Sequence, residues 1–462
     1  MRAPVLGAVS VLALLVAALF VAGFFPTAAD EAVVVLGGIA LLYGTFAFVA
    51  HGGGRITALG LFNFAFALFF GYGGIAEGTD PVRRTSAGYV SLAISVALVV
   101  QILVNLSAWR RASPADEAVT MPQVAYARWA TWVGAVGMAL IFTAQRLDLS
   151  RATSAVADGT VFACVVMLAV GLLYRHDTRL LSLRLGCVVV ALAIYAEVFH
   201  QGSGRLRLVA LACVIGLLLT ARFPHRGIKW AVVAVAPIAI WWLAQDRLAL
   251  QESIAAGASA GRTGLESMTT PILVLAQIIR AISGPGAALD PSWGHTFLSV
   301  PFILVPEALQ PTWVPDALGY QLVGLVDPGR LGTGFSVAGT VYGEAYWNAG
   351  WAGPLLAVPL LGWLLGVIDA RFRSALTALA ERPQALVVTV FWVMLAGGIA
   401  DLSWNGTHVW VARHLTRLPL LAVVGLLIWL RARRAATSAG RAPRTPLPAA
   451  QPSPPSAAAP AG

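Results

Sequence analysis

The sequence contains few charged residues and almost no lysine. Asp, Glu, Lys and Arg make up 11% of the 462 residues, and Lys229 is the only lysine. Soluble domains carry about 25% charged residues, so this composition excludes an ordinary soluble enzyme. It also excludes a nucleic-acid reader, although the net charge is +10. We therefore expect no nucleic-acid partner.

Cysteine and the common cofactor motifs are also scarce. The three cysteines, Cys164, Cys187 and Cys213, lie inside apolar runs, where a thiol behaves as a small hydrophobe. They cannot form a disulfide framework. The sequence has no Walker A loop, no His-Glu-x-x-His, no Asp-x-Asp pair and no zinc-type ligand spacing. It therefore predicts no bound cofactor and no obligatory metal.

Long apolar runs dominate the chain instead. Hydrophobic residues make up 58% of it, and the mean hydropathy is +0.78. A membrane-spanning helix needs about 20 mostly apolar residues. The sequence predicts an all-α integral membrane protein with about twelve transmembrane helices, at Val5–Phe25, Ala32–Ala50, Ile56–Ile75, Tyr89–Trp109, Ala130–Ala144, Gly159–Tyr174, Leu181–Phe199, Leu208–Ala221, Trp230–Ala244, Trp351–Ile368, Ala385–Ala400 and Leu415–Leu430.

The basic residues predict the orientation. With both termini in the cytoplasm, nineteen of the 31 Lys and Arg fall on the cytoplasmic side, as the positive-inside rule requires. We therefore expect a multi-pass protein of the cytoplasmic (inner) membrane. Residues 1–244 would hold spans 1–9, residues 245–350 a large extracytoplasmic loop with short helices, residues 351–430 spans 10–12, and residues 431–462 a disordered cytoplasmic tail.

The end of the predicted loop carries a glycine-rich segment, GRLGTGFSVAGTVYGEAYWNAGWAGPLLAVPLLGWLLG, from Gly329 to Gly366. It resembles the Wzy-type O-antigen polymerases, polytopic membrane glycosyltransferases in which a Gly-rich, Phe-Ser-containing segment leads into a Gly-Glu-x-Tyr-x-Asn-x-Gly run. The matching residues are Gly334, Phe335, Ser336, Gly343, Glu344, Tyr346, Asn348 and Gly350. The preceding stretch from Pro301 to Pro311 also resembles the proline-marked loop of such polymerases, so the resemblance covers roughly 65 residues.

Glu344 is the first candidate catalytic residue. It precedes an apolar span, where loss of water would raise the pKa of its carboxyl group and suit it to act as a general base toward a sugar hydroxyl. The alternative is a carboxylate that only stabilises a helix N-terminus. Tyr342, Tyr346 and Asn348 are candidates for binding the substrate. His295 is a second candidate base, with an ordinary surface histidine as the alternative.

Arginines on the outer face form the second theme of the resemblance, which implies a pyrophosphate-linked donor. Guanidinium groups bind phosphate oxygens in bidentate fashion and stabilise charge on a leaving group. Arg205 is the candidate catalytic arginine, and ion pairing is the alternative for it. Arg207, Arg280 and Arg330 are candidates for binding the substrate. His408 is a further candidate, in a predicted outer loop from Asp401 to His414.

The resemblance implies a metal-independent enzyme that joins oligosaccharide repeat units into a cell-surface polysaccharide. Its partners would be a polyprenyl-pyrophosphate-linked donor and acceptor and the membrane lipids, with a chain-length regulator and a flippase as further candidates. One alternative is a ligase-like transfer of finished glycan to another acceptor. An alternative of another class is a flippase or transporter of the lipid-linked oligosaccharide.

Overall fold

The structure is a computed structural model of the chain. It describes residues 3–21, 29–79, 86–109, 127–146, 154–174, 179–199, 205–239 and 266–439, apart from 288, 304, 306–308, 327, 333–335, 380–381 and 383. In these ranges the chain forms helices joined by turns, with no strand. The predicted disordered tail lies outside them from residue 440 onward, as does the start of the predicted loop, residues 245–265.

Each of the twelve apolar runs contains helix, but not every helix is long enough to cross a membrane alone. Within the described ranges, eight helices have the necessary length and apolar composition, and a bent pair of helices makes a ninth. The eight are Asp30–Ala50, Ala58–Thr79, Ala87–Ala108, Ala127–Ala144, Val156–Leu173, Leu181–Val198, Ala352–Ala378 and Ala385–Asn405. The architecture is that of an all-helical polytopic membrane protein.

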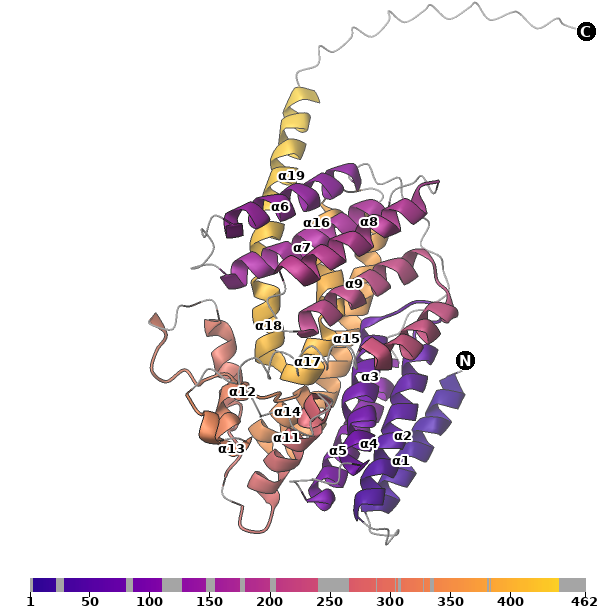
Figure 1. Cartoon of the computed structure of the whole chain (residues 1–462), viewed down its shortest axis with the longest axis vertical. Helices are drawn as coiled ribbons and strands as arrows, with labels where there is room; N and C mark the ends of the chain where they lie inside the picture. Colours follow the sequence, from indigo (N-terminus) through magenta and orange to yellow (C-terminus); the bar gives the residue numbers. More distant parts are fainter. Residues whose placement is uncertain are drawn as a thin grey trace, which may run out of the picture.

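The N-terminal helices form one bundle, at the lower right of Figure 1. It consists of α1 (Ala3–Val21), α2 (Ala29–Ala50), α3 (Ala58–Phe66), the π-helical η1 (Ala67–Tyr72), α4 (Gly73–Thr79) and α5 (Ala87–Trp109). Glycines bring their backbones together: a Cβ on Gly71 would lie 2.5 Å from the backbone of Leu41, and one on Gly37 would lie 2.6 Å from that of Ile75. Small residues at crossings drive helix association in membranes.

Five polar side chains form a buried network inside this bundle. Asn63 of α3 and Asn105 of α5 donate to each other's side-chain oxygens at 2.9 and 2.7 Å, and Asn105 also donates to the Tyr43 hydroxyl at 2.8 Å. Gln101 donates to Asn63 at 2.8 Å and accepts from the Tyr342 hydroxyl at 2.5 Å. Buried polar groups are costly unless hydrogen-bonded, so this network fixes how the helices meet.

The middle and the C-terminal parts of the chain pack beside this bundle. The helices are α6 (Ala127–Arg146), α7 (Ser154–Leu173), α8 (Leu181–Ile194) with the π-helical η3 (Tyr195–Phe199), α9 (Arg205–Arg222), α15 (Ala352–Ala378), α16 (Ala385–Gly397) and α19 (Leu418–Ala439). In Figure 1, α6, α7 and α8 lie together in the upper part of the molecule. α15 packs against α5 and α3 of the bundle, and α16 packs against α15, α9 and α7. α19 continues past the predicted end of its span at Leu430.

The described part of residues 245–350 is built of short helices, at the lower left of Figure 1. They are α11 (Glu266–Ser283), the 3-10 helix η4 (His295–Phe302), α12 (Leu318–Gln321), α13 (Val323–Val326), the 3-10 helix η6 (Pro328–Arg330) and α14 (Val341–Ala349). α11 packs against α4, η1 and α5 and buries Ile272, Leu275 and Ile279 completely or nearly so. This helix of the predicted loop is thus part of the packed bundle.

The predicted outer loop from Asp401 to His414 is helical instead. It forms α17 (Ile399–Asn405) and α18 (Thr407–Leu415), separated by Gly406. Gly406 adopts φ +80°, which a residue with a side chain rarely adopts. Polar residues such as Asp401 and His408 are typical of a loop. Here each forms an ion pair or a hydrogen bond with a neighbouring element, so both can lie in helices.

Candidate functional site

The glycine-rich segment leads into α14, whose N-cap residue has an unusual backbone conformation. Thr340 has φ +49°, and its N–H donates to the carbonyl of Trp404 in α17 at 2.9 Å. Its hydroxyl accepts from the Gly343 N–H at 2.8 Å, which satisfies one of the free donors at the helix start. The N-cap residue of α14 is therefore hydrogen-bonded to α17.

Glu344 lies in the first turn of α14 and points at the start of α18. Its Oε2 accepts hydrogen bonds from the N–H and the hydroxyl of Thr407, both at 2.6 Å. A Cβ on Gly406 would lie only 2.7 Å from the same oxygen, so glycine is needed there for close approach as well as for its φ. Glu344 thus caps a helix 63 residues further along the chain.

The carboxyl group of Glu344 is 2% exposed. Its burial raises the pKa from the usual 4.5 to about 6, although the two hydrogen bonds from Thr407 act in the opposite direction. Both of these bonds end on Oε2, so Oε1 is the oxygen placed to take a proton. A carboxyl group with such a pKa can exchange protons near neutral pH.

Asn348 and His408 hold η4 against α14 and α18. The Asn348 amide donates to the Thr296 hydroxyl at 2.6 Å and to the Glu344 carbonyl at 2.7 Å, and its Oδ1 accepts from Ser292 at 2.9 Å. His408 Nδ1 is hydrogen-bonded to the Ser299 hydroxyl at 2.7 Å. We call Glu344, Asn348, Thr407, His408 and η4 the α14–α18 junction.

The two candidate tyrosines of α14 are engaged within the protein. Tyr342 is buried and donates to Gln101 in the amide network. The Tyr346 hydroxyl is hydrogen-bonded to that of Ser283 at 2.7 Å, and its ring meets the ring of Trp351 edge-on at 5.1 Å. Both residues therefore fix α14 to the bundle and to α11 in this structure.

A second polar region lies at the other end of α18, where arginines surround a pocket of about 140 Å³. Arg207 of α9 forms an ion pair of 2.6 Å with Asp158 of α7, each about one quarter exposed. Arg413 forms an ion pair with the buried Asp401. We call the pocket lined by Asp158, Tyr195, Arg207, Arg413 and Arg417 the arginine pocket.

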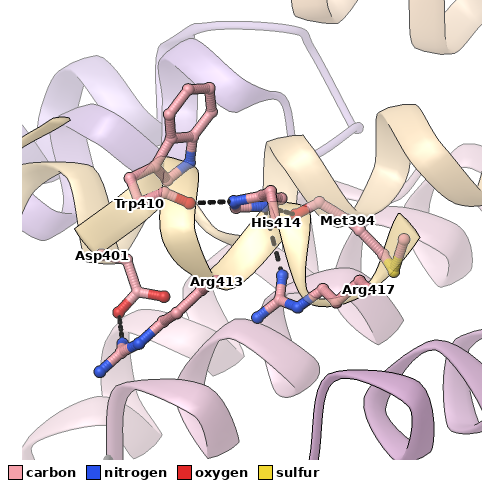
Figure 2. A network of polar contacts seen from close by, with 6 residues as sticks. All are labelled: Met394, Asp401, Trp410, Arg413, His414 and Arg417. Atoms are coloured by element: carbon pink, nitrogen blue, oxygen red, sulfur yellow. Dashed lines mark hydrogen bonds and ion pairs between the residues drawn. The ribbon is translucent and has the colours of Figure 1, made fainter. Parts of the chain in front are cut away.

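Arg417 is the most deeply placed of these arginines. Its guanidinium stacks on the Phe162 ring, 3.7 Å from the centroid, and it lies 3.2 Å from His414 Nε2. Figure 2 shows His414 held in turn by the carbonyls of Trp410 and Met394, at 2.6 and 3.0 Å. Stacking on an aromatic face stabilises a desolvated guanidinium by up to about 2 kcal/mol. The network therefore holds Arg417 at the wall of the pocket.

The two regions are linked by α18. Glu344 is hydrogen-bonded to Thr407, the first residue of α18, and Arg413, six residues later, lines the arginine pocket. Six residues of α-helix rise about 9 Å. The junction and the arginine pocket therefore lie about 9 Å apart along the axis of α18.

The structure places the predicted site residues in three groups. Glu344, Asn348 and His408 meet at the α14–α18 junction, and Arg207 lies in the arginine pocket. His295, Arg280 and Arg330 are exposed, at the start of η4, near the end of α11 and in η6. Arg205 begins α9, but its side chain lies outside the described residues, as do Gly334 and Phe335 of the motif.

Sequence reasoning missed Arg413 and Arg417 as members of the site. Their signal was present: Arg413 lies in the predicted outer loop and Arg417 at the outer end of the predicted span that follows it, where the positive-inside rule disfavours arginine. Their partners Asp401 and Phe162 come from other helices, so no local motif marks them. Among the residues that the structure describes, no group of three His, Cys, Asp or Glu side chains could hold a metal ion.

Comparison of the chain with family models, with curated proteins and with solved structures gave no match.

Proposed function

We propose that the protein is a membrane glycosyltransferase that joins polyprenyl-pyrophosphate-linked oligosaccharide repeat units on the outer face of the cytoplasmic membrane. The proposal includes twelve spans, two cytoplasmic termini and an outward-facing segment over residues 245–350. It rests on the resemblance of the segment around Glu344 to the Wzy-type polymerases and on the arrangement of the outer ends of the helices.

The observation that carries the proposal is the convergence of three arginines on one pocket. Arg207, Arg413 and Arg417 line it together with one carboxylate, Asp158, and Asp401 pairs with Arg413 behind it. Three guanidinium groups against two carboxylates leave a net positive charge. The predicted topology puts the helix ends that carry them on the outer side. A pyrophosphate, with its oxygens matched to guanidinium forks, suits such a pocket.

The proposed reaction needs a leaving group, a nucleophile and a base. A hydroxyl oxygen of the incoming unit attacks the reducing-end carbon of the growing chain and forms the new glycosidic bond. The bond from that carbon to the pyrophosphate oxygen breaks, and the polyprenyl pyrophosphate leaves with the electron pair. The arginines stabilise its charge, and Glu344 takes the proton of the hydroxyl. His295 is the alternative base.

Purified protein in lipid, supplied with native polyprenyl-pyrophosphate repeat units, tests the proposal by the length of the product on a gel. We expect a ladder from the wild type, its loss in Arg207→Ala, and the same result for Arg205→Ala if that side chain also contacts the donor. Arg207 suits the test because its partly exposed ion pair contributes little to stability. Arg433→Ala, at the predicted cytoplasmic end of α19, is the matched control.

Glu344→Gln separates the two roles open to Glu344. The amide oxygen of glutamine can still accept from Thr407, so the variant keeps the cap but cannot take a proton. Loss of the ladder with an intact fold supports a base, whereas full activity assigns Glu344 to capping alone. Single transfer to another acceptor would indicate a ligase. Movement of the intact lipid-linked unit between leaflets, without transfer, would indicate a flippase and overturn the proposal.

A further inference from the structure

A long apolar groove of about 740 Å³ runs between α2, the helix formed by α3 and η1, and the helix over residues 226–239. Two of these helices line it with side chains spaced four residues apart: Leu41, Thr45, Val49, Phe64, Leu68 and Tyr72. Residues at this spacing share one face of a helix, so the groove runs along the helix axes. Eight residues of helix rise about 12 Å.

Among the described residues that line the groove, Arg226 is the charged one, and it lies at one of the groove's ends. The third helix begins there, and Trp230 and Val233 continue the lining along it. This end lies by the C-terminus of α2, because a Cβ on Gly54 would lie 2.7 Å from the backbone of Pro224. The groove is thus a hydrocarbon-lined channel with a cation at its mouth.

A second cation, Lys229, stands one turn from Arg226 but points elsewhere. Its ammonium donates to the carbonyl oxygens of Phe48, at 3.0 Å, and of His51, at the end of α2. Cations at a helix C-terminus interact favourably with the exposed carbonyls. Arg226 is exposed, and none of the described carboxylates forms an ion pair with it. It is therefore the cation available to a ligand.

The depth of this end in the membrane follows from its residues. The predicted topology places it on the cytoplasmic side, and Trp230 is 55% exposed beside the groove. Tryptophan collects at the boundary between hydrocarbon and headgroups. Arg226, one turn further out, then lies at the level of lipid phosphates. Basic pockets between helices on this side of a membrane are suited to anionic headgroups.

We propose that this groove binds a phospholipid with an anionic headgroup from the cytoplasmic leaflet, with its phosphate on Arg226 and one acyl chain along α2. The acyl chain fills a space lined by apolar atoms. Without it, these atoms would have no neighbours to pack against on that side. The described lining residues include no carboxylate to pair with a choline or an ethanolamine, so the charge of Arg226 at the mouth favours an anionic lipid. This inference uses the proposed topology but not the proposed activity.

Native mass spectrometry of the purified full chain, exchanged into detergent with equal amounts of phosphatidylglycerol and phosphatidylcholine, tests the proposal. We expect the wild type to retain phosphatidylglycerol preferentially. Arg226→Ala should reduce this preference about fivefold, the effect of removing one basic residue near an anionic headgroup. Thr45→Trp, which narrows the groove and keeps Arg226, should reduce the retention of both lipids.

Arg433→Ala is the control, because Arg433 also lies over a tryptophan, Trp429, at the predicted cytoplasmic face. It should leave the preference unchanged. Equal retention of the two lipids by the wild type would overturn the proposal. So would an Arg226→Ala variant that matches the wild type, or one whose effect Arg433→Ala reproduces. Unchanged elution on size exclusion shows that each variant is folded.

Discussion

The two ends of α18 both contact a buried carboxylate, but they stabilise it in different ways. At the first end, Glu344 accepts hydrogen bonds from the neutral Thr407. At the other end, Asp401 pairs with Arg413, and Arg417 stacks on Phe162 close by. Thr407 offers Glu344 only neutral hydrogen-bond donors, whereas Arg413 adds the Coulomb attraction of a cation to its contact with Asp401. The same helix thus joins a carboxyl group held by neutral donors to one held by the fixed charge of a guanidinium.

The fixed-charge end should show the largest effect on substitution. Arg413→Ala leaves Asp401, which is fully buried, without its cation. We expect the free energy of unfolding to fall by about 3–5 kcal/mol, measured as thermal unfolding of the purified protein in detergent. Asp401→Asn, added to the same variant, should recover part of the loss. An unchanged unfolding temperature for Arg413→Ala would refute the difference between the two ends.

The capped end should show a smaller effect. Glu344→Ala removes two hydrogen bonds and leaves the partly buried Thr407 N–H without its acceptor, so we expect a loss of about 2 kcal/mol. Glu344→Gln should restore most of it, because the amide oxygen still accepts. Thermal unfolding of the two variants side by side measures this. Equal losses of stability in the two variants would mean that the charge of Glu344, and not its hydrogen bonds to Thr407, stabilises α18.

The pH dependence of stability should also differ between wild type and Glu344→Gln. Burial raises the pKa of Glu344 from 4.5 to about 6, so between these values the folded protein binds more protons than the unfolded one. The free energy of unfolding therefore falls as pH rises through this window, by about 2 kcal/mol from this group. The difference in the free energy of unfolding between wild type and variant, measured from pH 4 to pH 7, isolates that contribution. If this difference did not change with pH, the prediction would be wrong.

The smallest effect on stability is expected at the edge of the arginine pocket. Arg207 and Asp158 are both partly exposed, and exposed ion pairs stabilise proteins by about 0–1 kcal/mol. Arg207→Ala should therefore unfold within a few degrees of the wild type. A larger loss would show that Arg207 belongs to the structural network of Arg413 and Arg417, and would weaken its use as a probe of substrate binding.

The apolar helices could be predicted from the sequence because hydropathy is a local property. The cores of α2, α5 and α7 fall within the predicted runs. The helices α17 and α18 could not be predicted, because their polar residues are satisfied by distant partners. Asp401 is paired by Arg413, and the start of α18 is capped by Glu344, 63 residues earlier in the chain.

The candidate site divides in the same way. Glu344 could be found from a local pattern of glycine, tyrosine and asparagine around it. The sequence also suggests its neighbours Asn348 and His408 as candidates. It does not show the hydrogen bonds by which they hold η4. Arg417 has no local pattern, because its environment is made by Phe162, 255 residues earlier in the chain. Only the three-dimensional arrangement shows that these arginines share one pocket.

The amide network also bears on how the chain is assembled during its synthesis. Asn63 and Asn105 enter the lipid on different helices, and each has its partner on the other. Neither helix has its polar side chains satisfied until the two meet, which favours their pairing soon after insertion. The Tyr342 hydroxyl reaches Gln101 only after 241 more residues have been made. The Gln101 side-chain oxygen thus lacks this donor inside the early bundle until α14 packs against it. The bond can form only at that late stage of synthesis.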